Sequence, residues 1–414
     1  MKNFSKWMAV PLAFSFTSLG YAAAFQYYEL GTPVIGTAAV GQAALANDAS
    51  TAYFNPAGMT QLSASQYMVG SEIFIPFTDF KTNSANTISG DEGGNAASVV
   101  PGMALFYVYH LSPKIQLGVS FTSPYNGILT YNNGWVGRYI TEASQFYTLN
   151  LNPSMAFKVN EWAAIGIGFA VEYANLYQTV AFPLPLELPP PLEGNVQGEA
   201  TIKAHDTAVG FNVGLLFTPT AVTKIGLAYR SQITHNLSGN TAFLRTLTTP
   251  PTTTQMVMPQ NIILSLNQKV HKSVNLLAEA GWANWSKMHD AVLTIDGLTE
   301  ISPLDWKDTY RVGVGLQYQA TKPWLLQTGV SYDSSPTSAS RRTPNLPMDG
   351  QYRIGLGTIY HPTAFIQMGF SYEFLYLGEA KINNVSSRGT LSGAYNKNYA
   401  NVLQASINVT SASL

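Results

Sequence analysis

The chain has 414 residues, a formal net charge of −1, no cysteine and only 11% charged residues. Soluble domains usually carry about 25% charged residues, so this composition disfavours an ordinary soluble fold. The missing cysteines exclude disulfides and thiolate metal sites, and the near-neutral charge gives no electrostatic basis for binding nucleic acid.

The N-terminus has the pattern of an export signal. Lys2 and Lys6 form a basic start, residues 7–19 are mostly apolar, and residues 22–24 are three alanines that suit a cleavage site. We therefore predict a signal peptide over residues 1–24, whose removal takes the formal charge from −1 to −3. A short membrane anchor is the alternative, but the apolar stretch is shorter than the ~20 residues that a membrane helix needs.

Residues 25–64 are rich in small residues and precede the first predicted strand. The alanines of residues 38–46 predict a short helix, and Asn47 or Asp48 is a natural N-cap for a second turn through Tyr53. Proline after Asn55 then favours an extended or turn conformation. Short helices joined by turns suit a compact plug, although the segment could instead be a solubilising N-terminal extension.

Residues 65–414 read as a series of strands. Segments with a two-residue hydrophobic period recur, and no stretch after residue 24 has the ~20 apolar residues of a membrane helix. This pattern is typical of an all-β transmembrane barrel, in which every second residue faces lipid. We predict about 14 antiparallel strands. They begin near Gln66, Val100, Ile115, Thr141, Trp162, Glu199, Thr223, Pro259, Val274, Asp305, Trp324, Asp349, Ala364 and Asn396.

The breaks between these strands alternate in length. Short breaks such as residues 112–114, 160–161 and 271–273 read as periplasmic turns. Longer breaks rich in Pro, Ser and Thr, such as residues 182–198 and 240–258, read as extracellular loops. This asymmetry is expected of an outer-membrane barrel.

Within the predicted strands, the charged residues fall on one set of alternate positions, or phase, and the apolar residues on the other. In residues 310–318 the apolar phase holds Tyr310, Val312, Val314 and others, whereas Arg311 lies on the opposite phase. The same separation holds for Glu172, Arg230, Glu279, Asp333, Arg353 and Glu373. A Lys or Arg on the lipid face costs about 2–4 kcal/mol at the bilayer midplane. We therefore predict that these charges point into the barrel. A soluble sandwich would also alternate, but the low charge content and the leader favour the membrane barrel.

Glycines recur on the inward phase, in pairs at Gly166/Gly168, Gly313/Gly315 and Gly355/Gly357. They could leave room for a plug or a ligand path, or they could merely ease strand bending. In the third strand, Pro124 and Gly127 interrupt the pattern, because proline cannot donate to a β-ladder. Either the strand continues past a local break in the wall, or it ends at Ser123.

The chain resembles the FadL/TodX family of outer-membrane transporters of fatty acids and hydrophobic compounds. The resemblance begins at Phe25-Gln26 and Glu29, includes residues 47–51 and 55–59, and extends through most of the remaining chain. Later matching segments are residues 135–139, 152–156, 214–217, 225–231, 306–311, 329–336 and 342–347. Leu414 departs from the aromatic residue that usually ends such barrels, which leaves the end of the last strand open.

The resemblance implies a plug, or hatch, of short helices inside the barrel lumen. It implies that Phe25 touches the ligand, and that Asn55, Pro56 and Ala57 anchor the plug against an opening in the third strand. By the same resemblance, Asp48 is one of the residues that form the plug and its gate, and Pro124 and Gly127 would lie near the opening.

The implied activity is passive uptake of a hydrophobic molecule. The ligand would be captured at the extracellular loops, move to a deeper pocket, displace the plug and leave sideways into lipid. A long-chain fatty acid is the first candidate, and an aromatic hydrocarbon is the alternative. A carboxylate head group needs a cation, for which Arg230, Arg311 and Arg353 are inward candidates, although each could instead pair with an inward acid such as Glu172, Glu279 or Glu373.

We expect a monomer in the outer membrane of a Gram-negative bacterium, with the hydrophobic ligand and membrane lipid as partners. No cofactor or metal is expected, because the six histidines show no ligand spacing. No nucleophile elbow or paired carboxylates indicate an enzyme. An aqueous porin and a surface adhesin or receptor remain as alternative functions.

Overall fold

The structure is a computed structural model that describes residues 26–183, 197–244, 249–386 and 389–411. The predicted signal peptide and most of the predicted loop over residues 182–198 lie outside these ranges. Among the described residues, no helix is both long enough and apolar enough to cross a bilayer.

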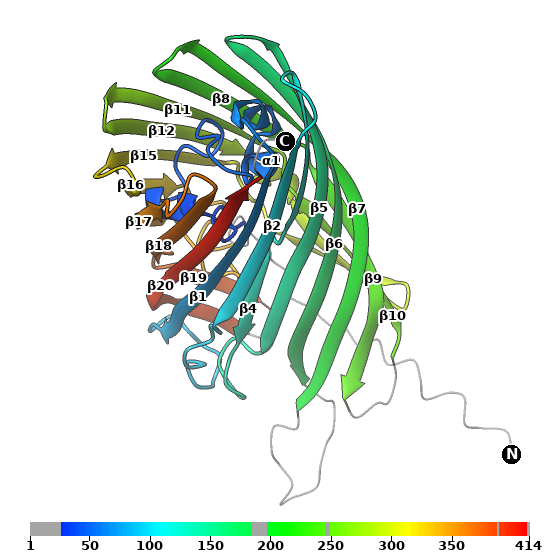
Figure 1. Cartoon of the computed structure of the whole chain (residues 1–414). Helices are drawn as coiled ribbons and strands as arrows, with labels where there is room; N and C mark the ends of the chain where they lie inside the picture. The colour runs from blue at the N-terminus through cyan, green and yellow to red at the C-terminus, as the bar shows by residue number, and fades with distance from the viewer. Residues whose placement is uncertain (1–25, 184–196, 245–248, 387–388, 412–414) are drawn as a thin grey trace, which may run out of the picture.

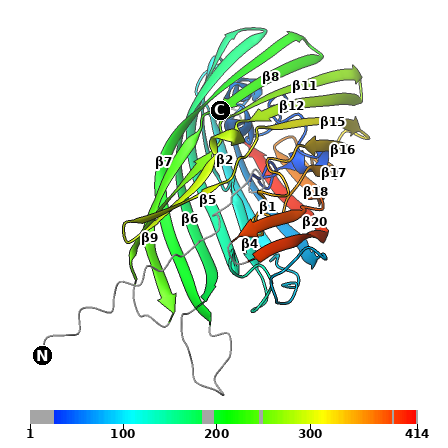
Figure 2. The same cartoon turned by 180° about the vertical axis from the view of Figure 1, so that it is seen from behind.

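The described strands form a closed antiparallel barrel (Figure 1, Figure 2). Each wall strand pairs with the next along the chain, and the last pairs with the first over seventeen positions, from Gln66–Thr410 to Thr82–Gly393. Nine wall strands are continuous: β1 (Gln66–Thr82), β2 (Val100–His110), β5 (Ala143–Asn160), β6 (Ala163–Pro183), β7 (Gln197–Thr220), β16 (Trp324–Asp333), β17 (Gln351–Tyr360), β18 (Ile366–Tyr376) and β20 (Gly389–Thr410).

Five further wall strands are interrupted, which gives the fourteen predicted strands among the described residues. Their halves are β3 (Ile115–Thr122) with β4 (Asn126–Thr130), β8 (Thr223–Arg230) with β9 (Ile233–Leu244), β10 (Pro251–Met258) with β11 (Asn261–His271), β12 (Val274–Ala283) with β13 (Asp290–Ile295), and β14 (Leu298–Pro303) with β15 (Thr309–Gln319). The short β19 (Ile382–Ser386) pairs with the start of β20.

The two faces of the wall differ as the charge pattern predicted. On β15 the side chains of Tyr310, Val312 and Val314 are exposed to the outside, whereas Arg311 is 2% exposed. The inward charges Glu172, Glu279, Asp333, Arg353 and Glu373 are likewise buried. The prediction that mid-strand charges point inward is confirmed.

The prediction of a loop over residues 240–258 was wrong. β9 continues to Leu244, and β10 begins at Pro251 and pairs with it from Pro251–Asn240 to Met258–Ile233. Threonine and glutamine made β10 look like a loop, but threonine favours strands, and polar side chains are tolerated where a strand is not in contact with lipid. β14, with the sequence LTEISP, was also missed, because it is short and has no clear two-residue period.

The first described residues, from Gln26 to the start of β1, lie inside the barrel and are drawn in blue in Figure 1. Two 3-10 helices, η2 (Pro33–Thr37) and η3 (Pro56–Gln61), flank the short helix α1 (Thr51–Phe54). We call residues 32–62 the plug. The helix predicted over residues 38–46 is absent, since Ala38, Ala39 and Ala46 have positive φ angles of 54°, 56° and 47°. Ser50, and not Asn47 or Asp48, stands at the N-cap of α1.

Glycines of the wall allow the plug backbone to approach closely. A Cβ atom at Gly329 would collide with the Thr37 carbonyl, and one at Gly226 with the carbonyl of Ala43. Similar collisions with plug atoms would occur at Gly118, Gly166, Gly214, Gly313, Gly355 and Gly369, and one at Gly70 would involve the Gly31 carbonyl just before the plug. Of the paired glycines, Gly166, Gly313, Gly355 and Gly357 therefore make room for the plug, whereas Gly168 and Gly315 face other wall residues.

Candidate functional site

The wall is interrupted at the third strand. β3 pairs with both β2 and β5, whereas the pairings of β4 within the described residues are with β5. Between β4 and the chain that precedes β2, one isolated bridge joins Ala97 to Leu129. Pro124 lies at the break, where it has no N–H to continue the ladder. Gly127 lies just beyond, paired with Phe146 in the regular part of β4.

Residues 26–31, which we call the arm, lie across this break. Gln26 forms an isolated antiparallel bridge with Tyr125, and the Tyr27 amide donates a hydrogen bond of 2.8 Å to the Pro124 carbonyl. The arm thus supplies backbone hydrogen bonds at the position where the ladder is broken. Phe25 lies outside the described residues, so its predicted ligand contact stays a prediction.

A narrow cavity of about 20 Å³ remains between the arm, β1, β2 and the break. The Tyr27 ring packs edge-on against Phe74 beside it, with ring centroids 5.1 Å apart. The Gly31 amide donates a hydrogen bond of 2.9 Å to Glu72. The residues that line the cavity are Tyr27, Leu30, Glu72, Phe74, Val100, Gly102, Met103, Ser123 and Asn126. The arm is therefore the part of the chain that closes the wall here.

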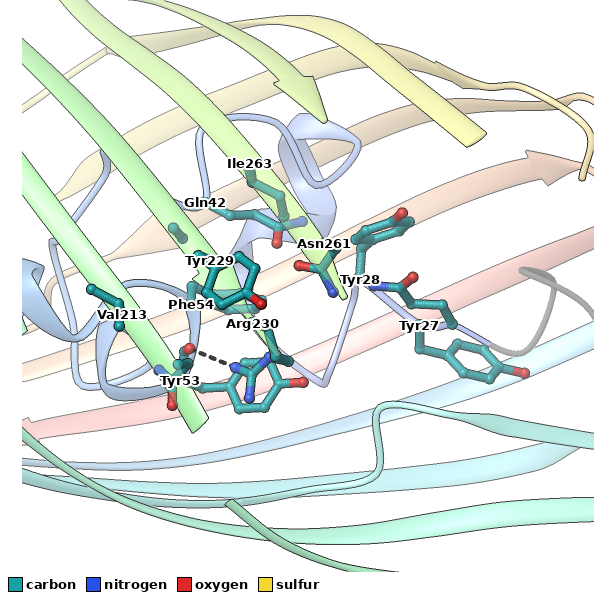
Figure 3. A pocket seen from close by; sticks show the side chains of 13 residues that line it. Tyr27, Tyr28, Gln42, Tyr53, Phe54, Val213, Tyr229, Arg230, Asn261 and Ile263 are labelled. Carbon is teal, nitrogen blue, oxygen red and sulfur yellow. Dashed lines mark hydrogen bonds between the residues drawn. The ribbon is translucent and has the colours of Figure 1, made fainter. Parts of the chain in front are cut away.

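A second pocket, of about 40 Å³, lies between the arm, the plug and strands β7, β8 and β11 (Figure 3). The guanidinium of Arg230 stacks over the Tyr53 ring at 4.0 Å and donates through Nη2 to the Tyr53 carbonyl at 3.0 Å. Arg230 Nη1 is buried and has no hydrogen-bond acceptor among the described residues. The aromatic residues that line the pocket are Tyr27, Tyr28, Tyr53, Phe54 and Tyr229.

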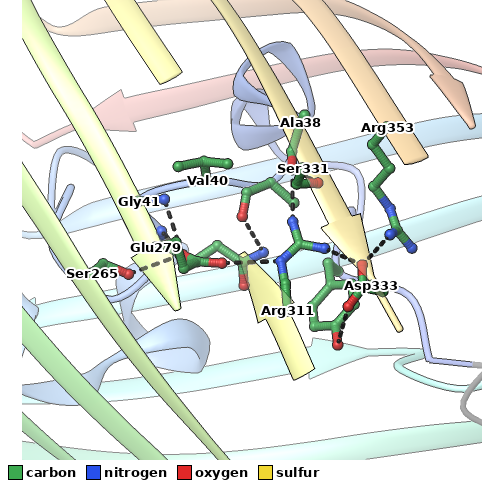
Figure 4. A network of polar contacts seen from close by, with 12 residues as sticks. Ala38, Val40, Gly41, Ser265, Glu279, Arg311, Ser331, Asp333 and Arg353 are labelled. Carbon is green, nitrogen blue, oxygen red and sulfur yellow. Dashed lines mark hydrogen bonds and ion pairs between the residues drawn. The ribbon is translucent and has the colours of Figure 1, made fainter. Parts of the chain in front are cut away.

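Arg311 and Arg353 do not line this pocket. Arg311 donates to Glu279 at 3.2 Å, to Asp333 at 2.8 Å and to the Ala38 carbonyl of the plug at 2.7 Å (Figure 4). The second oxygen of Glu279 accepts from the plug amide of Gly41 at 2.9 Å. The hydrogen bonds to Ala38 and from Gly41 fasten the plug to the wall, and the ion pairs join the wall residues that make them.

Arg353 extends this network to the arm. Its Nε donates to Glu29 at 2.9 Å, and its Nη1 contacts Asp333, which Arg311 shares. The Tyr28 ring lies under both guanidinium groups, 4.3 Å from Arg311 and 5.3 Å from Arg353. Arg311 and Arg353 therefore have the ion-pair role that the sequence analysis named as the alternative to ligand binding.

The predicted plug residues make contacts that hold the plug in place. Asn55 donates to the carbonyls of Ala43 at 2.7 Å and of Leu215, in β7, at 3.0 Å. Its side-chain oxygen Oδ1 accepts from the Ala57 amide at 3.1 Å. Pro56 begins η3 and lies against the wall at Gly166.

Asp48 has both local and wall contacts. Its Oδ1 accepts from the Ser50 amide at 3.0 Å, and its Oδ2 accepts from Gln367 of β18 at 3.3 Å. Burial raises the pKa of the Asp48 carboxyl, although the hydrogen bonds from Ser50 and Gln367 oppose this rise.

The interior changes in polarity along the barrel. Near the long loops, buried apolar side chains from many strands form one cluster, which we call the apolar cluster. Its large members are Tyr125, Phe146, Leu176, Ile202, Ile233, Leu237, Met256, Met258, Trp285, Met288, Leu293, Leu304, Trp306 and Leu346. Transmembrane barrels usually have a polar interior, so an apolar interior of this extent is unusual for a barrel.

Beside the plug, the wall interior is polar. Buried hydroxyl and amide groups there have oxygen atoms without a hydrogen-bond partner among the described residues. We call them the polar belt: Ser120, Thr122, Asn150, Asn152 and Asn212. Ser154, next to them on β5, donates to the Ala52 carbonyl of the plug at 3.4 Å. An apolar molecule would therefore meet hydrogen-bonding groups before it reached the short-turn end.

Several of these residues were missed by the sequence analysis. Glu29 was part of the resemblance but received no role, and Glu72 was not considered. His235 lies buried between Glu172 at 3.2 Å and Asp206 at 3.3 Å, where it joins β6, β7 and β9. Glu72 and His235 shared one signal, their position on the inward phase of a strand, whereas Glu29 lies outside the strands. The partners of all three are far apart from them in the sequence.

A closed barrel with a lipid-facing exterior, an internal plug and an apolar inner lining defines a transport protein of the outer membrane. The family description "Outer membrane protein transport protein (OMPP1/FadL/TodX)" matches residues 13–411. The chain therefore belongs to this family of outer-membrane transporters of hydrophobic compounds.

Relatives agree with this assignment over nearly the whole chain. The long-chain fatty acid transport protein of Salmonella typhi is 25% identical over 401 residues, which cover 88% of this chain and 90% of that protein. Among solved structures, a Pseudomonas aeruginosa FadL homologue has a TM-score of 0.86 at 21% identity and covers 94% of this chain and 99% of that one. The Ralstonia pickettii toluene transporter TbuX has a TM-score of 0.67 at 15% identity, covering 93% and 100%.

Proposed function

We propose that this protein takes up long-chain fatty acids passively through the outer membrane. The apolar cluster is the observation that carries this proposal, because an apolar solute gains nothing from a water-filled pore. The name of the Salmonella relative supports fatty acids as the ligand class.

We infer that the ligand leaves sideways through the wall at Pro124. The ladder is broken there, and at the break itself the arm makes only the Gln26–Tyr125 bridge and the hydrogen bond from Tyr27 to Pro124, among the described residues. Glu29 and Gly31 hold the other end of the arm to the wall. The plug, in contrast, is held by Arg311, Asn55 and close wall contacts. Displacement of the arm alone would therefore open the route, with most of the plug kept in place.

The head group would be bound by Arg230. Its Nη1 is buried and unpartnered, and a carboxylate forms strong charge-assisted hydrogen bonds with guanidinium groups. Arg311 and Arg353 have carboxylate partners already. We expect Arg230→Gln to weaken binding of a fatty acid at least tenfold and to leave binding of the matching alkane unchanged.

Aromatic hydrocarbons are the second candidate ligands. The five aromatic rings around the Arg230 pocket favour them, and the toluene transporter TbuX shares the fold. Ligands that co-purify with the detergent-solubilised protein, identified by mass spectrometry, discriminate the two classes. An aromatic ligand without a carboxylate, bound equally by Arg230→Gln, would refute the fatty-acid assignment.

The side exit has its own test. Replacing Pro124→Val together with Tyr125→Thr should let the third strand run on and should block uptake of labelled oleate by cells. Pro113→Val in a periplasmic turn is the matched control and should leave uptake unchanged. Normal uptake with a repaired strand would refute the side exit. Steady single-channel conductance in planar bilayers would instead support an aqueous porin, and normal uptake after deletion of the long loops, with loss of cell-surface binding, would support an adhesin.

A further inference from the structure

The contact between the arm and the wall holds an excess of buried acid. Within one network, two guanidinium groups, those of Arg311 and Arg353, meet four carboxyl groups. The four acids are Glu29 of the arm, Glu279 of β12, Asp333 of β16 and Glu373 of β18, and all are buried. Buried charges are normally paired and hydrogen-bonded.

Two of these acids are well accommodated as anions. Glu279 accepts from Arg311, Ser265 and two plug amides, and Asp333 contacts both arginines. They account for the charges of both guanidinium groups. Glu29 and Glu373 then share the Nε of Arg353, so the network holds two more carboxyl groups than guanidinium groups.

Glu373 is the exceptional member of the network. It is 0% exposed, and neither of its carboxylate oxygens receives a hydrogen bond from a described donor. Its nearest cation is Arg353, whose Nε lies 3.6 Å away and already donates to Glu29 at 2.9 Å. The Glu29 and Glu373 carboxyl groups thus lie beside the same Arg353 nitrogen, one at 2.9 Å and the other at 3.6 Å.

Two facing carboxyl groups in a buried site favour one shared proton, because two like charges at this distance repel each other. We propose that Glu373 carries this proton, donates a hydrogen bond to Glu29, and thereby holds the arm over the break in the wall. Glu373 is in this sense a positioning residue for the arm. When it loses the proton, repulsion between the two carboxylates favours release of the arm.

The groups that face this carboxyl pair come from several elements. Arg353 of β17, Asp333 of β16 and Arg311 of β15 lie on one side. The Tyr28 hydroxyl donates to Asp333 at 3.4 Å, and Gln404 of β20 donates to the Gly31 carbonyl at 3.0 Å. Glu72 of β1, which accepts from the Gly31 amide, is the other carboxyl beside the arm and is the competing candidate for a proton-linked response.

The absence of cysteine from the chain allows a direct test. A nitroxide attached to Gln26→Cys reports whether the arm is held or released, by electron paramagnetic resonance in lipid bilayers. Because the held state binds one proton more, the ratio of held to released arm should fall as the pH rises from 6 to 10, by up to roughly tenfold per pH unit.

Two variants distinguish the contribution of Glu373 to the pH response from that of Glu72. Glu373→Gln supplies a permanent N–H donor, so the arm should stay held at every pH and the slope should vanish. Glu72→Gln is the matched control and should keep the slope. A slope that persists in Glu373→Gln, a slope that disappears in Glu72→Gln, or a wild-type arm that stays held without any slope would overturn the proposal. Heat-modified migration on gels verifies that each barrel is folded.

The consequence for transport rests on the proposed function, whereas the spin-label measurement of the arm is independent of it. If the arm responds to pH as expected and oleate uptake does not follow it, the carboxyl pair stands and the side exit fails. If uptake depends on Pro124 and the label shows no pH response, the side exit stands and the carboxyl pair fails.

Discussion

The side chain of Asn55 connects three parts of the chain through three hydrogen bonds: the plug at Ala43, the turn at Ala57 and the wall at Leu215. Asn55→Ala leaves these backbone groups without their partner. Each buried unsatisfied group costs about 1–3 kcal/mol. We expect the plug to dock less firmly and oleate uptake to slow, while the barrel stays folded.

Hydrogen exchange of the amides of residues 33–61 measures this docking. Thr60→Ala is the control, because Thr60 makes one local bond of 2.9 Å to the Ala57 carbonyl and is half-buried. Unchanged exchange and uptake in Asn55→Ala would contradict the anchoring role.

Asp48 makes plug docking depend on pH. Burial raises the pKa of its carboxyl, so the docked plug binds the proton more tightly than the free chain does. Docking is therefore favoured below the folded pKa, and it weakens as the pH rises from the ordinary aspartate pKa of about 3.9 through the higher folded pKa, by up to tenfold per pH unit. We expect Asp48→Asn to remove this trend and to dock more firmly than wild type at pH 7.

The same hydrogen-exchange measurement at pH 4 and pH 7 checks this. Gln367→Ala is the comparison, because it removes the hydrogen bond from the wall to Asp48 but keeps the carboxyl. Firmer docking of the wild type at pH 7 than at pH 4 would show that the sign is wrong.

At the scale of elements, the wall glycines offer a matched pair. Gly329 of β16 faces Gly315 of β15 in the ladder. A methyl group at Gly329 would collide with the plug carbonyl of Thr37, whereas one at Gly315 would meet its neighbours at an ordinary 3.4 Å. Overpacking costs about 1–3 kcal/mol, so Gly329→Ala should loosen the plug and Gly315→Ala should not.

Single-channel recordings in planar bilayers report a loosened plug as transient conductance. We expect frequent openings for Gly329→Ala and a quiet trace for Gly315→Ala. Equal behaviour of the two variants would mean that the wall glycines do not seat the plug.

Much of the wall could be predicted from the sequence, because lipid imposes a two-residue period on every strand that it touches. β10 escaped prediction because its threonines and glutamine lie where lipid imposes no such rule, and β14 because six residues are too few to show the period. The plug helix over residues 38–46 was predicted from alanine content, but contacts with the wall fix positive φ angles there. The inward direction of Arg230 was predictable, whereas its stacking on Tyr53, 177 positions away, was not.

For the whole molecule, the exterior should behave as a lipid-facing surface. Val314 is 59% exposed and lies midway between Tyr310 and Tyr318 on β15. Val314→Lys should reduce the folding stability in lipid vesicles by about 2–4 kcal/mol, as expected near the bilayer midplane. Urea titration in vesicles measures the change.

Thr321→Lys, in a turn beyond the end of β15, is the control and should change the stability by at most about 1 kcal/mol. A smaller loss for Val314→Lys than for Thr321→Lys would mean that the outer surface of β15 does not meet hydrocarbon.

The contrast between the apolar cluster and the polar belt has a consequence for selectivity. Along the barrel axis a solute passes from surroundings that resemble a hydrocarbon solvent to surroundings rich in hydroxyl and amide groups. Its oil-to-amide partition coefficient, more than its shape, would then decide how far it travels. Hydrocarbon-rich solutes would stop above the belt and move sideways into the bilayer. Sugars and amino acids would not enter the apolar cluster. The barrel would therefore select solutes by partitioning, without an energy source.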